Sequence, residues 1–476
     1  MSEFQRMANP PVNLLAQLAQ SVGTENLLTD PTELEAYAWD NTGIRARPDA
    51  VVLAACQDHV IATLKACSRV GVPVIARGAG TGNVGGALAA HGGVILSTQR
   101  MNRIMEISLD DRLAVVEPGV VNGDLQHALA EKGLFWPPDP SSSQSCSIGG
   151  NIAMCAAGPN AIRYGVTRDW VLGLTAVLAD GSVIRTGGRV TKGVVGYDLT
   201  RLLVGSEGSL AVVTQAVLKL APKPQARRLL SAAFASVAEA AQATSMLMSQ
   251  GTPPSAIEFL DPSALDLLRR EEVVELPDAA RALLLLEVSG DHDDVERQAD
   301  AVVARLEPVQ PVELARANNN SEAKRIWAAR NALSPALKRL SPKRVNEDVV
   351  VPVSRLAALI DGCEVISAEL DLPMVNFGHA GNGNIHVNFL VDPSDDTSME
   401  KIKPALDQLF RLVLDLGGTL SGEHGVGTQK RPYVGWELDE TTLDLQRRLK
   451  LLFDPTNTLN PGKIFPEQGA DFLRPG

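Results

Sequence analysis

The sequence predicts an α+β fold with more than one domain, and three observations support this prediction. The chain has 476 residues, more than a single hydrophobic core ordinarily organises. Short β-rich runs alternate with helical stretches between about residues 50 and 220. The composition then changes near 222–228, and a second series of helices and strands follows. We therefore predict domains at 1–222 and 223–455, and a C-terminal segment at 456–476 that returns to the first domain.

The individual elements follow from the periodicity of apolar residues. Residues 11–40 have the spacing of amphipathic helices, and the first domain is expected to contain strands at "AVVLAAC", "VPVIARG", "GVILST", "RLAVVEPG", "VLGLTAVLADGSVIRTG" and "SLAVVTQAVLKLAP". The second domain is expected to contain a helix at "VAEAAQATSMLMSQG" and strands at "AIEFLD" and "RALLLLEVSG". Further helices are expected from about 293 to 341, near 399–416, and before the terminal "DPTNTLNPGKIF".

Composition and charge argue against several classes of partner. The net charge of −12 argues against nucleic acid and against electrostatic docking on anionic lipid. The five cysteines are scattered without a CxxC pair, which is typical of a reduced chain. The N-terminal residues do not have a signal-peptide pattern, and no apolar stretch reaches the ~18 residues that a spanning helix needs. We expect a cytoplasmic protein, with peripheral membrane association left open.

A glycine-rich loop at 77–86, "RGAGTGNVGG", contains Gly80-x-Gly82-x-x-Gly85. A Rossmann fold would need a full helix from the last glycine and an acidic residue about 20 residues later, and the sequence supplies neither. We predict instead that the loop turns between two strands and that its free main-chain N–H groups cradle phosphate. A glycine-rich connection without a ligand is the alternative.

Two further segments, at 137–165 and 205–214, are dense in small residues. Small side chains let a large, flat ligand lie against the main chain, so that backbone amides become its hydrogen-bonding groups. Together with the glycine-rich loop, these segments predict a dinucleotide site. A tightly packed structural loop is the alternative.

Two of the seven histidines, His379 and His386, flank an Asn-Gly pair in "NFGHAGNGNIHVNFL". Asn-Gly is typical of a two-residue type I′ turn, which would place the two histidines opposite each other with Cβ atoms ~4.5–5.5 Å apart. Two neutral imidazoles provide half of a site for Zn²⁺ or a similar divalent ion. Glu423, in "SGEHGVGTQK", is the predicted third ligand of a His₂Glu site with one open position. A pair of surface or hydrogen-bonded histidines is the alternative.

Six segments occur in an order that resembles the flavin-linked D-2-hydroxyacid dehydrogenases of the vanillyl-alcohol-oxidase superfamily. They are "PVIARGAGTGNVGG", "DPSSSQSCSIGGNIA", "LLVGSEGSLAVVT", "GHAGNGNIH", "SGEHGVGTQKR" and "DPTNTLNPGKIF", and the resemblance covers about residues 35–468. The group includes the D-lactate, D-2-hydroxyglutarate and glycolate dehydrogenases. The resemblance implies a two-part FAD-binding domain of the vanillyl-alcohol-oxidase type, an α+β cap domain for the substrate, and the same metal ligands. Many relatives have Asp where this chain has Asn382.

The predicted cofactor is FAD, bound without a covalent link, because the glycine-rich loop contains neither His nor Cys and because Cys146 and Cys155 match no attachment position of the superfamily. The residues assigned to FAD binding are Arg77, Gly78, Ala79, Gly80, Thr81, Gly82, Asn83, Gly86, Pro138, Asp139, Ser145, Ser147, Ile148, Gly149, Asn151, Ala153, Gly158, Glu207, Gly208, Val212 and Asn460.

The implied reaction is oxidation of a D-2-hydroxy acid to the 2-oxo acid. In this reaction the hydroxyl and the carboxylate of the substrate would together chelate the metal, a base would take the hydroxyl proton, and flavin would accept hydride. His424, beside a predicted ligand, is the predicted base; a core histidine bonded to the main chain is the alternative. By resemblance, Arg330 clamps the substrate carboxylate, and Ser334 lies one turn further on the same helix face. A solvated helix face is the alternative for this basic segment, 325–352.

Asn388 and Asn460 complete the predicted substrate-binding set. Relatives specific for D-2-hydroxyglutarate carry Lys where this chain has Asn346, and that Lys holds the distal carboxylate. Its absence here favours a smaller acid such as D-lactate. A D-2-hydroxyglutarate dehydrogenase and a glycolate oxidase-type subunit stay open as alternatives.

Two other classes of protein were compared with the dehydrogenase. A metallohydrolase using His379, His386 and Glu423 would leave the first 220 residues unexplained, and a non-catalytic nucleotide-binding module would not need the His₂Glu set. The electron acceptor stays open among a quinone, a cytochrome, an electron-transfer flavoprotein and, for an oxidase, oxygen. A homodimer stays open as the assembly.

Overall fold

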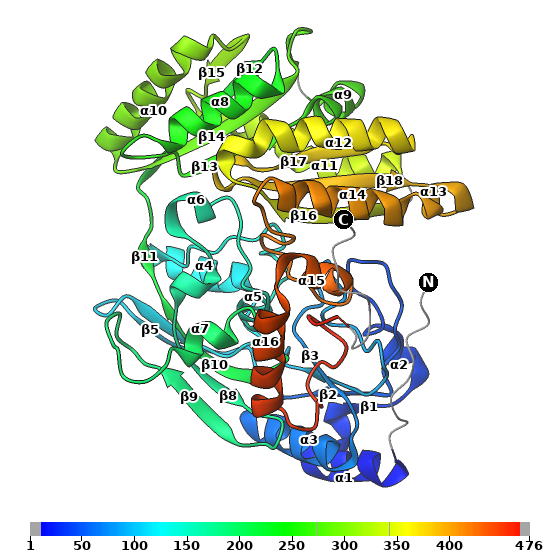
Figure 1. The fold of residues 1–476 in the computed structure, drawn as a ribbon. Coiled ribbons are helices and arrows are strands. Elements are labelled where there is room, and N and C mark those ends of the chain that lie inside the picture. The colour runs from blue at the N-terminus through cyan, green and yellow to red at the C-terminus, as the bar shows by residue number, and fades with distance from the viewer. Residues whose placement is uncertain (1–10, 274, 342, 467–476) are drawn as a thin grey trace. The chain divides into compact units, whose positions relative to one another are not determined.

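A computed structural model describes residues 11–273, 275–341 and 343–466 of the chain (Figure 1). The chain forms two compact units. The first comprises 1–158, 165–223 and 423–476, and the second comprises 159–164 and 224–422. The boundary between residues 223 and 224 lies one residue from the predicted one.

The chain returns to the first unit at residue 423, earlier than the predicted 456. The reason lies in α16 (Glu440–Phe453), whose buried Lys450 donates hydrogen bonds to the main-chain oxygens of Ser209 (2.8 Å) and Leu459 (2.9 Å). The amphipathic pattern of α16 predicts that the helix packs on a hydrophobic core. It does not indicate which of the two units supplies that core.

The first sheet of the first unit has four strands in the order β1-β2-β4-β3. Strands β2, β3 and β4 are parallel, and α1 and α3 pack against them through one apolar cluster. The glycine-rich loop starts where β3 ends and runs through turns to β4, which confirms that it connects two strands. The bounds are β1 (Leu27–Leu28), β2 (Ala50–Leu53), β3 (Val74–Arg77), β4 (Val94–Ser97), α1 (Val12–Val22), α2 (Pro31–Glu35) and α3 (Gln57–Val70).

The second sheet of this unit is antiparallel, with order β5-β6-β10-β8-β9, and a short pair joins β7 to β11. Its strands are β5 (Ile104–Ser108), β6 (Leu113–Val116), β8 (Val171–Val177), β9 (Val183–Gly187), β10 (Val212–Lys219), β7 (Leu134–Phe135) and β11 (Ala221–Pro222). Short helices connect them: α4 (Asn122–Ala130), α5 (Ile148–Met154) and α7 (Leu199–Leu203).

The second unit contains a seven-stranded antiparallel sheet of order β15-β12-β14-β13-β17-β18-β16. Helices α8, α12 and α14 lie along one face (Figure 1), and the apolar sides of α9 and α11 pack on the other face against residues such as Leu285 and Phe377. The strands are β12 (Ala226–Phe234), β13 (Ala256–Leu260), β14 (Ala282–Gly290), β15 (Glu313–Arg316), β16 (Lys343–Val350), β17 (Met374–His379) and β18 (Asn384–Val391). The helices are α6 (Ala161–Tyr164), α8 (Val237–Met248), α9 (Pro262–Arg270), α10 (His292–Leu306), α11 (Asn320–Leu340), α12 (Leu356–Leu370), α13 (Asp396–Glu400) and α14 (Ile402–Asp415).

The hairpin of β17 and β18 has a longer turn than predicted. Residues 380–382 form a single 3₁₀ turn and Gly383 has φ 70°, so His379 pairs with Asn384, and His386 pairs with Phe377. The prediction that the two histidines are directly opposed was therefore wrong. A Cβ on Gly383 would lie 1.8 Å from the carbonyl oxygen of Val351, and this long-range approach, which shapes the turn, is invisible in the local sequence. A shift of two residues preserves strand alternation, so the histidines still share one face.

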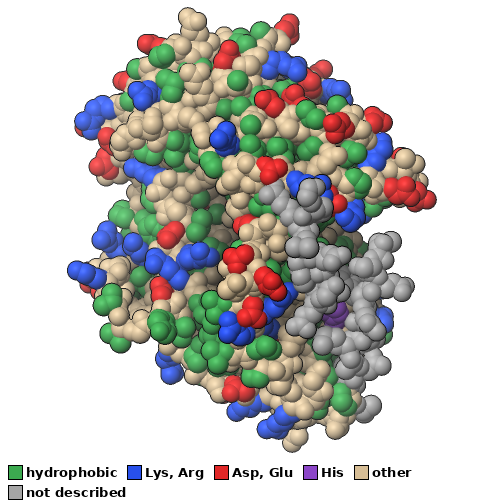
Figure 2. Space-filling model, viewed as in Figure 1, with side chains coloured by type: hydrophobic (Ala, Val, Ile, Leu, Met, Phe, Trp, Pro, Cys, Tyr) green, Lys and Arg blue, Asp and Glu red, His purple; other side chains and the backbone are tan. Residues whose placement is uncertain are grey.

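Strand β16 was not among the predicted strands: the predicted helices ended at about 341, and a solvated helix face was the alternative for the basic segment 325–352. Only its first part is helix α11; the second part is the edge strand of the seven-stranded sheet. None of the helices in the described part of the chain combines the length and the apolar character needed to cross a bilayer. On the face drawn in Figure 2, Lys and Arg side chains are interspersed with Asp and Glu side chains.

Candidate active site

The first unit contains a groove that is partly open to solvent. It is lined by the glycine-rich loop, by the small-residue segment around α5, and by the segment from Leu203 to Val213. Fifteen of the predicted cofactor-binding residues line it: Arg77, Gly78, Ala79, Gly80, Thr81, Gly82, Asn83, Gly86, Ser147, Gly149, Asn151, Ala153, Glu207, Gly208 and Val212. The three predicted segments therefore meet in one place.

The glycine-rich loop offers main-chain donors to a ligand. Asn41 bonds to the carbonyl oxygens of Thr81 (2.9 Å) and Gly82 (3.2 Å), which fixes the peptide orientation. Among the hydrogen bonds of the described residues, the N–H groups of 78–83 donate to no other group. A Cβ on Gly82 would meet nothing within 4 Å. Successive unused amides beside open space fit the phosphates of a dinucleotide.

Sequence reasoning missed part of the groove wall and included residues outside it. Asn41, Thr98 and Pro118 line the groove but lie outside the quoted motifs, so no local pattern marked them. Cofactor contact stays a prediction for all of the assigned residues, and six of them are not among the described lining residues: Pro138, Asp139, Ser145, Ile148, Gly158 and Asn460.

Asn460 holds two parts of the groove wall together. Its amide nitrogen donates to the main-chain oxygen of Glu207 (2.5 Å), and its amide oxygen accepts from the main-chain nitrogen of Ala76 (3.2 Å). Ala76 and Glu207 both line the groove. The buried Asn460 therefore supports the wall from the C-terminal segment, whose importance the motif "DPTNTLNPGKIF" had indicated.

His424 and Glu423 also line this groove. The side-chain nitrogen of Asn83 lies 3.2 Å from Nε2 of His424. The carboxylate of Glu207 accepts from the amides of Val426 (2.7 Å) and Gly427 (2.8 Å), which holds the segment that follows His424. Burial raises the pKa of Glu207, although these amides and two lysines act in the opposite direction.

Gly425 permits a sharp bend beside His424. Its φ is 84°, and a Cβ there would lie 2.5 Å from the methyl carbon of Met154. A larger residue would therefore be strained and would also collide with the groove wall. The bend allows adjacent side chains of this segment to leave the main chain in different directions.

In the second unit, the predicted histidines are close neighbours. The ring centroids of His379 and His386 are 5.3 Å apart, and a ring nitrogen of each lies within 4.8 Å of one on the other. Both residues are about 7% exposed. The pair therefore fits two ligands of one divalent ion, the chemistry that its donor atoms favour.

A buried carboxylate joins His379 to Arg330. Glu258, on β13, lies with Oε1 2.5 Å from Nδ1 of His379 and accepts at Oε2 from Nε of Arg330 (2.8 Å). Burial alone would raise the pKa of Glu258, but His379 and Arg330 outweigh it and lower this pKa to about 2. The Arg330 guanidinium also lies over the ring of Phe377, 4.6 Å from its centroid.

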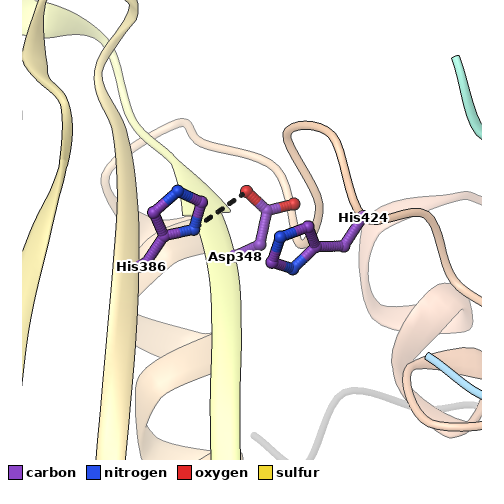
Figure 3. A group of neighbouring side chains, drawn as sticks. All are labelled: Asp348, His386 and His424. Carbon is purple, nitrogen blue, oxygen red and sulfur yellow. Dashed lines mark ion pairs between the residues drawn. The ribbon is translucent and has the colours of Figure 1, made fainter. Parts of the chain in front are cut away.

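A second buried carboxylate lies beside His386. Oδ1 of Asp348 is 3.9 Å from Nδ1 of His386, the ion pair marked in Figure 3. The same carboxylate accepts from the amide side chain of Asn384 (2.6 Å), the hydroxyl of Ser421 (3.1 Å) and the amide of Gly422 (2.8 Å). Each histidine thus has a carboxylate on its Nδ1 side, a common arrangement around metal-binding imidazoles.

Sequence reasoning missed Glu258 and Asp348. A usable signal existed for Glu258, because it is the single charged residue within the apolar strand "AIEFL". A lone carboxylate at a buried strand position needs partners, and such positions are often functional.

The remaining predicted substrate residues lie on the same sheet face or on α11. Asn388 is fully buried, bonds to main-chain oxygens of β17 and β18, and accepts from Asn346 (2.7 Å). Ser334 is half-buried, one turn after Arg330 on α11. Strand alternation places Arg344 on the same face as Asn346 and Asp348.

Two protein-family models match successive parts of this chain. Residues 48–187 match an FAD binding domain, and residues 223–464 match the C-terminal domain of FAD linked oxidases. The glycolate oxidase subunit GlcD of Bacillus subtilis (strain 168) is 40% identical over 450 residues, which cover 94% of this chain and 96% of that protein. The chain belongs to the FAD-linked oxidases. A D-lactate dehydrogenase of Anaerostipes hadrus is 30% identical over 477 residues, with 98% and 99% of the two chains covered.

Solved structures agree with this FAD-linked oxidase fold. p-Cresol methylhydroxylase aligns with a TM-score of 0.82 at 18% identity, covering 96% of this chain and 97% of that one. A 4-ethylphenol oxidase from Gulosibacter chungangensis aligns with a TM-score of 0.77 at 20% identity, with the same coverage. These neighbours confirm the predicted α+β fold of the vanillyl-alcohol-oxidase type. The FAD-linked oxidase is thus an FAD-dependent oxidoreductase of the hydroxyacid dehydrogenase and oxidase group.

We predict that acid precipitation of the purified FAD-linked oxidase leaves its yellow colour in the supernatant. Cys146 lines the groove, but burial raises the pKa of its thiol, which disfavours the thiolate that would attack a flavin. Flavin that remained in the pellet would contradict non-covalent binding. In that case, release of the colour by Cys146→Ser would identify the attachment point.

Proposed function

We propose that this FAD-linked oxidase oxidises a short D-2-hydroxy acid, D-lactate, to the 2-oxo acid. The observation that carries the proposal is the juxtaposition, in the second unit, of His379 and His386 on one face of the seven-stranded sheet with Arg330 of α11. A pair of imidazoles and an arginine suit a substrate with a hydroxyl beside a carboxylate. The similarity to a D-lactate dehydrogenase supports the same substrate class.

His379, His386 and Glu423 are the proposed ligands of a divalent metal, with Zn²⁺ as the first candidate. The buried imidazoles and the carboxylates on their Nδ1 sides support this assignment. Glu423 belongs to the other compact unit, so its participation is part of the proposal. When bound, FAD supplies a hydride acceptor at N5 and the metal supplies a Lewis acid for the substrate oxygen atoms.

Arg330 is the proposed clamp for the substrate carboxylate. Its Nε is held by Glu258, and its two terminal nitrogens donate no hydrogen bond to the described residues. Two parallel donors from one guanidinium match the two oxygens of a carboxylate. Arg330 would therefore bind and orient the acid group while the hydroxyl carbon stays free to react.

His424 is the proposed base for the hydroxyl proton. An amide nitrogen can only donate, so the contact with Asn83 leaves Nε2 of His424 as the acceptor, with its proton on Nδ1 in this tautomer. At 3.2 Å this bond is at the long end of the normal range, and a substrate hydroxyl could replace Asn83 as donor. Nε2 would then take the proton.

Glycolate is the second candidate substrate. The relative at 40% identity is a glycolate oxidase subunit, and glycolate differs from D-lactate by one methyl group. Anaerobic mixing with each acid tests the proposal, because a substrate bleaches the absorbance of oxidised flavin. Absence of bleaching with D-lactate, glycolate and D-2-hydroxyglutarate would refute the proposed substrate class.

We predict a higher kcat/KM for D-lactate than for D-2-hydroxyglutarate. Asn346, which donates to Asn388, is uncharged, and a second carboxylate without a partner would cost about 1–3 kcal/mol. Arg344 could reverse the result, because it shares the strand face of Asn346 and could pair with the second carboxylate. Burial lowers the pKa of Arg344, and no ion pair of the described residues involves it.

The two kcat/KM values measured under one set of conditions decide this prediction. If D-2-hydroxyglutarate is preferred, the absence of the lysine does not exclude it. Arg344→Gln would then be expected to remove the preference. Lys343→Gln, whose side chain alternates to the other face of β16, is the matched control.

A further inference from the structure

We infer that Glu258 is a positioning residue that couples the metal-binding and substrate-binding side chains of the second unit. The inference deepens the proposed function and rests on it, because it takes His379 as a metal ligand and Arg330 as the carboxylate clamp. Glu258 would touch neither the metal nor the substrate. It would act by fixing the orientation of the two groups that do.

The two oxygens of Glu258 serve partners from different elements. Oε1 faces His379, at the end of β17, and Oε2 accepts from Arg330, on α11. The Glu258 side chain is fully buried, while His379 and Arg330 side chains are 9% and 16% exposed. Strand register places Glu258 directly opposite His379, so the contact is fixed by the sheet and not by a mobile loop.

The contact with His379 determines which ring nitrogen is available. A carboxylate oxygen at 2.5 Å from Nδ1 requires a proton on Nδ1. The lone pair of a neutral imidazole then resides on Nε2, the nitrogen that would bind a metal. Such carboxylate–histidine pairs fix both the tautomer and the ring orientation of metal ligands.

The contact with Arg330 determines which edge of the guanidinium is available. The guanidinium of Arg330 is held on two sides: Nε donates to Glu258, and the Phe377 ring lies against the guanidinium plane. The terminal nitrogens remain for a carboxylate. One buried acid therefore sets the direction of both binding groups, and a defect in it should weaken metal and substrate binding together.

A second buried carboxylate of the same sheet provides a matched control. Glu287, on β14, is 7% exposed and contacts Arg227 (3.3 Å) and Ser255 (3.4 Å). Arg227 is half-exposed at the surface, and Glu287 has no described contact with His379, His386 or Arg330. Loss of its charge should test the general cost of altering a buried acid.

The experiment compares Glu258→Gln with Glu287→Gln in the full-length flavoprotein. Glutamine keeps the volume but replaces one carboxylate oxygen with an NH₂ donor, so either His379 or Arg330 would face a donor instead of an acceptor. Metal-free protein is titrated with Zn²⁺ in competition with a chromogenic chelator, and KM and kcat for D-lactate are measured at saturating Zn²⁺. We expect Glu258→Gln to bind Zn²⁺ about 10–100-fold more weakly and to raise KM, with normal flavin content. Glu287→Gln should retain wild-type Zn²⁺ affinity and KM.

The outcomes separate this inference from the proposed function. Wild-type Zn²⁺ affinity and KM in Glu258→Gln would overturn the inference and leave the metal assignment intact. Failure of the wild-type protein to bind Zn²⁺ would instead overturn the proposed function. If Glu258→Gln does not fold, Glu258→Asp replaces it, because it keeps the charge and shortens the side chain. A folded Glu258→Asp with wild-type Zn²⁺ affinity and KM would equally overturn the inference.

Discussion

Replacing His424 with alanine is expected to lower kcat by roughly 10²–10⁴-fold, the usual contribution of a positioned general base. The side chain lines the flavin groove, and its Nε2 faces an amide donor that a substrate hydroxyl could replace. Flavin content should stay normal, since the amides that we expect to bind the cofactor phosphates lie in the 78–83 loop. Anaerobic stopped-flow measurement of flavin reduction isolates the affected step from reoxidation.

Two further variants sharpen the interpretation of His424. His127→Ala removes an exposed imidazole on α4 and should leave kcat unchanged. Glu423→Ala should lose metal while His424→Ala keeps it. The opposite pattern would mean that the two adjacent residues have exchanged roles. Near-normal kcat of His424→Ala across the pH range would show that the base lies elsewhere.

Removing the metal is expected to abolish turnover without releasing flavin. Two of the three proposed metal ligands, His379 and His386, lie in the second unit, whereas the third, Glu423, lines the groove of the first unit. None of the three is part of the 78–83 loop whose main-chain amides are proposed to hold the cofactor, so flavin should stay bound when the metal is removed. Dialysis against a chelator should preserve the flavin spectrum and reduce activity to background, and Zn²⁺ should restore it. Metal content is measured by atomic spectroscopy on the same samples.

The histidine variants provide the control for metal removal. His379→Ala should resemble the chelated enzyme and should not recover when Zn²⁺ is added, because one ligand is gone. Full activity in protein verified as metal-free would contradict the metal assignment. It would also remove the reason for the buried carboxylates beside His379 and His386, which would then need a purely structural explanation.

The predictions that succeeded depended on local sequence. The glycine-rich loop between strands and the small-residue segments follow from side-chain size, which a sequence states directly. The shared face of His379 and His386 survived an incorrect turn, because strand alternation tolerates a register shift of two residues.

The features that were missed depend on contacts between distant segments. The approach of Val351 to Gly383 selects the turn, and the partners of Glu258 lie on β17 and α11, far along the chain. The basic composition around Arg344 concealed an edge strand, because strand formation there depends on pairing with β18. No periodicity within these segments encodes such partners.

The return of the chain at residue 423 makes residues 224–422, the main part of the second unit, an insertion within the first. Residues 224–422 are bracketed by flavin-unit sequence on both sides, so they could be exchanged between relatives as a cassette. In such a chimera, the residues at positions 330, 379 and 386 would come from the donor protein, whereas Glu423 and His424 would come from the recipient. Recognition and acid–base chemistry would then come from different parents, and both junctions, not one, would have to be preserved for the chimera to fold.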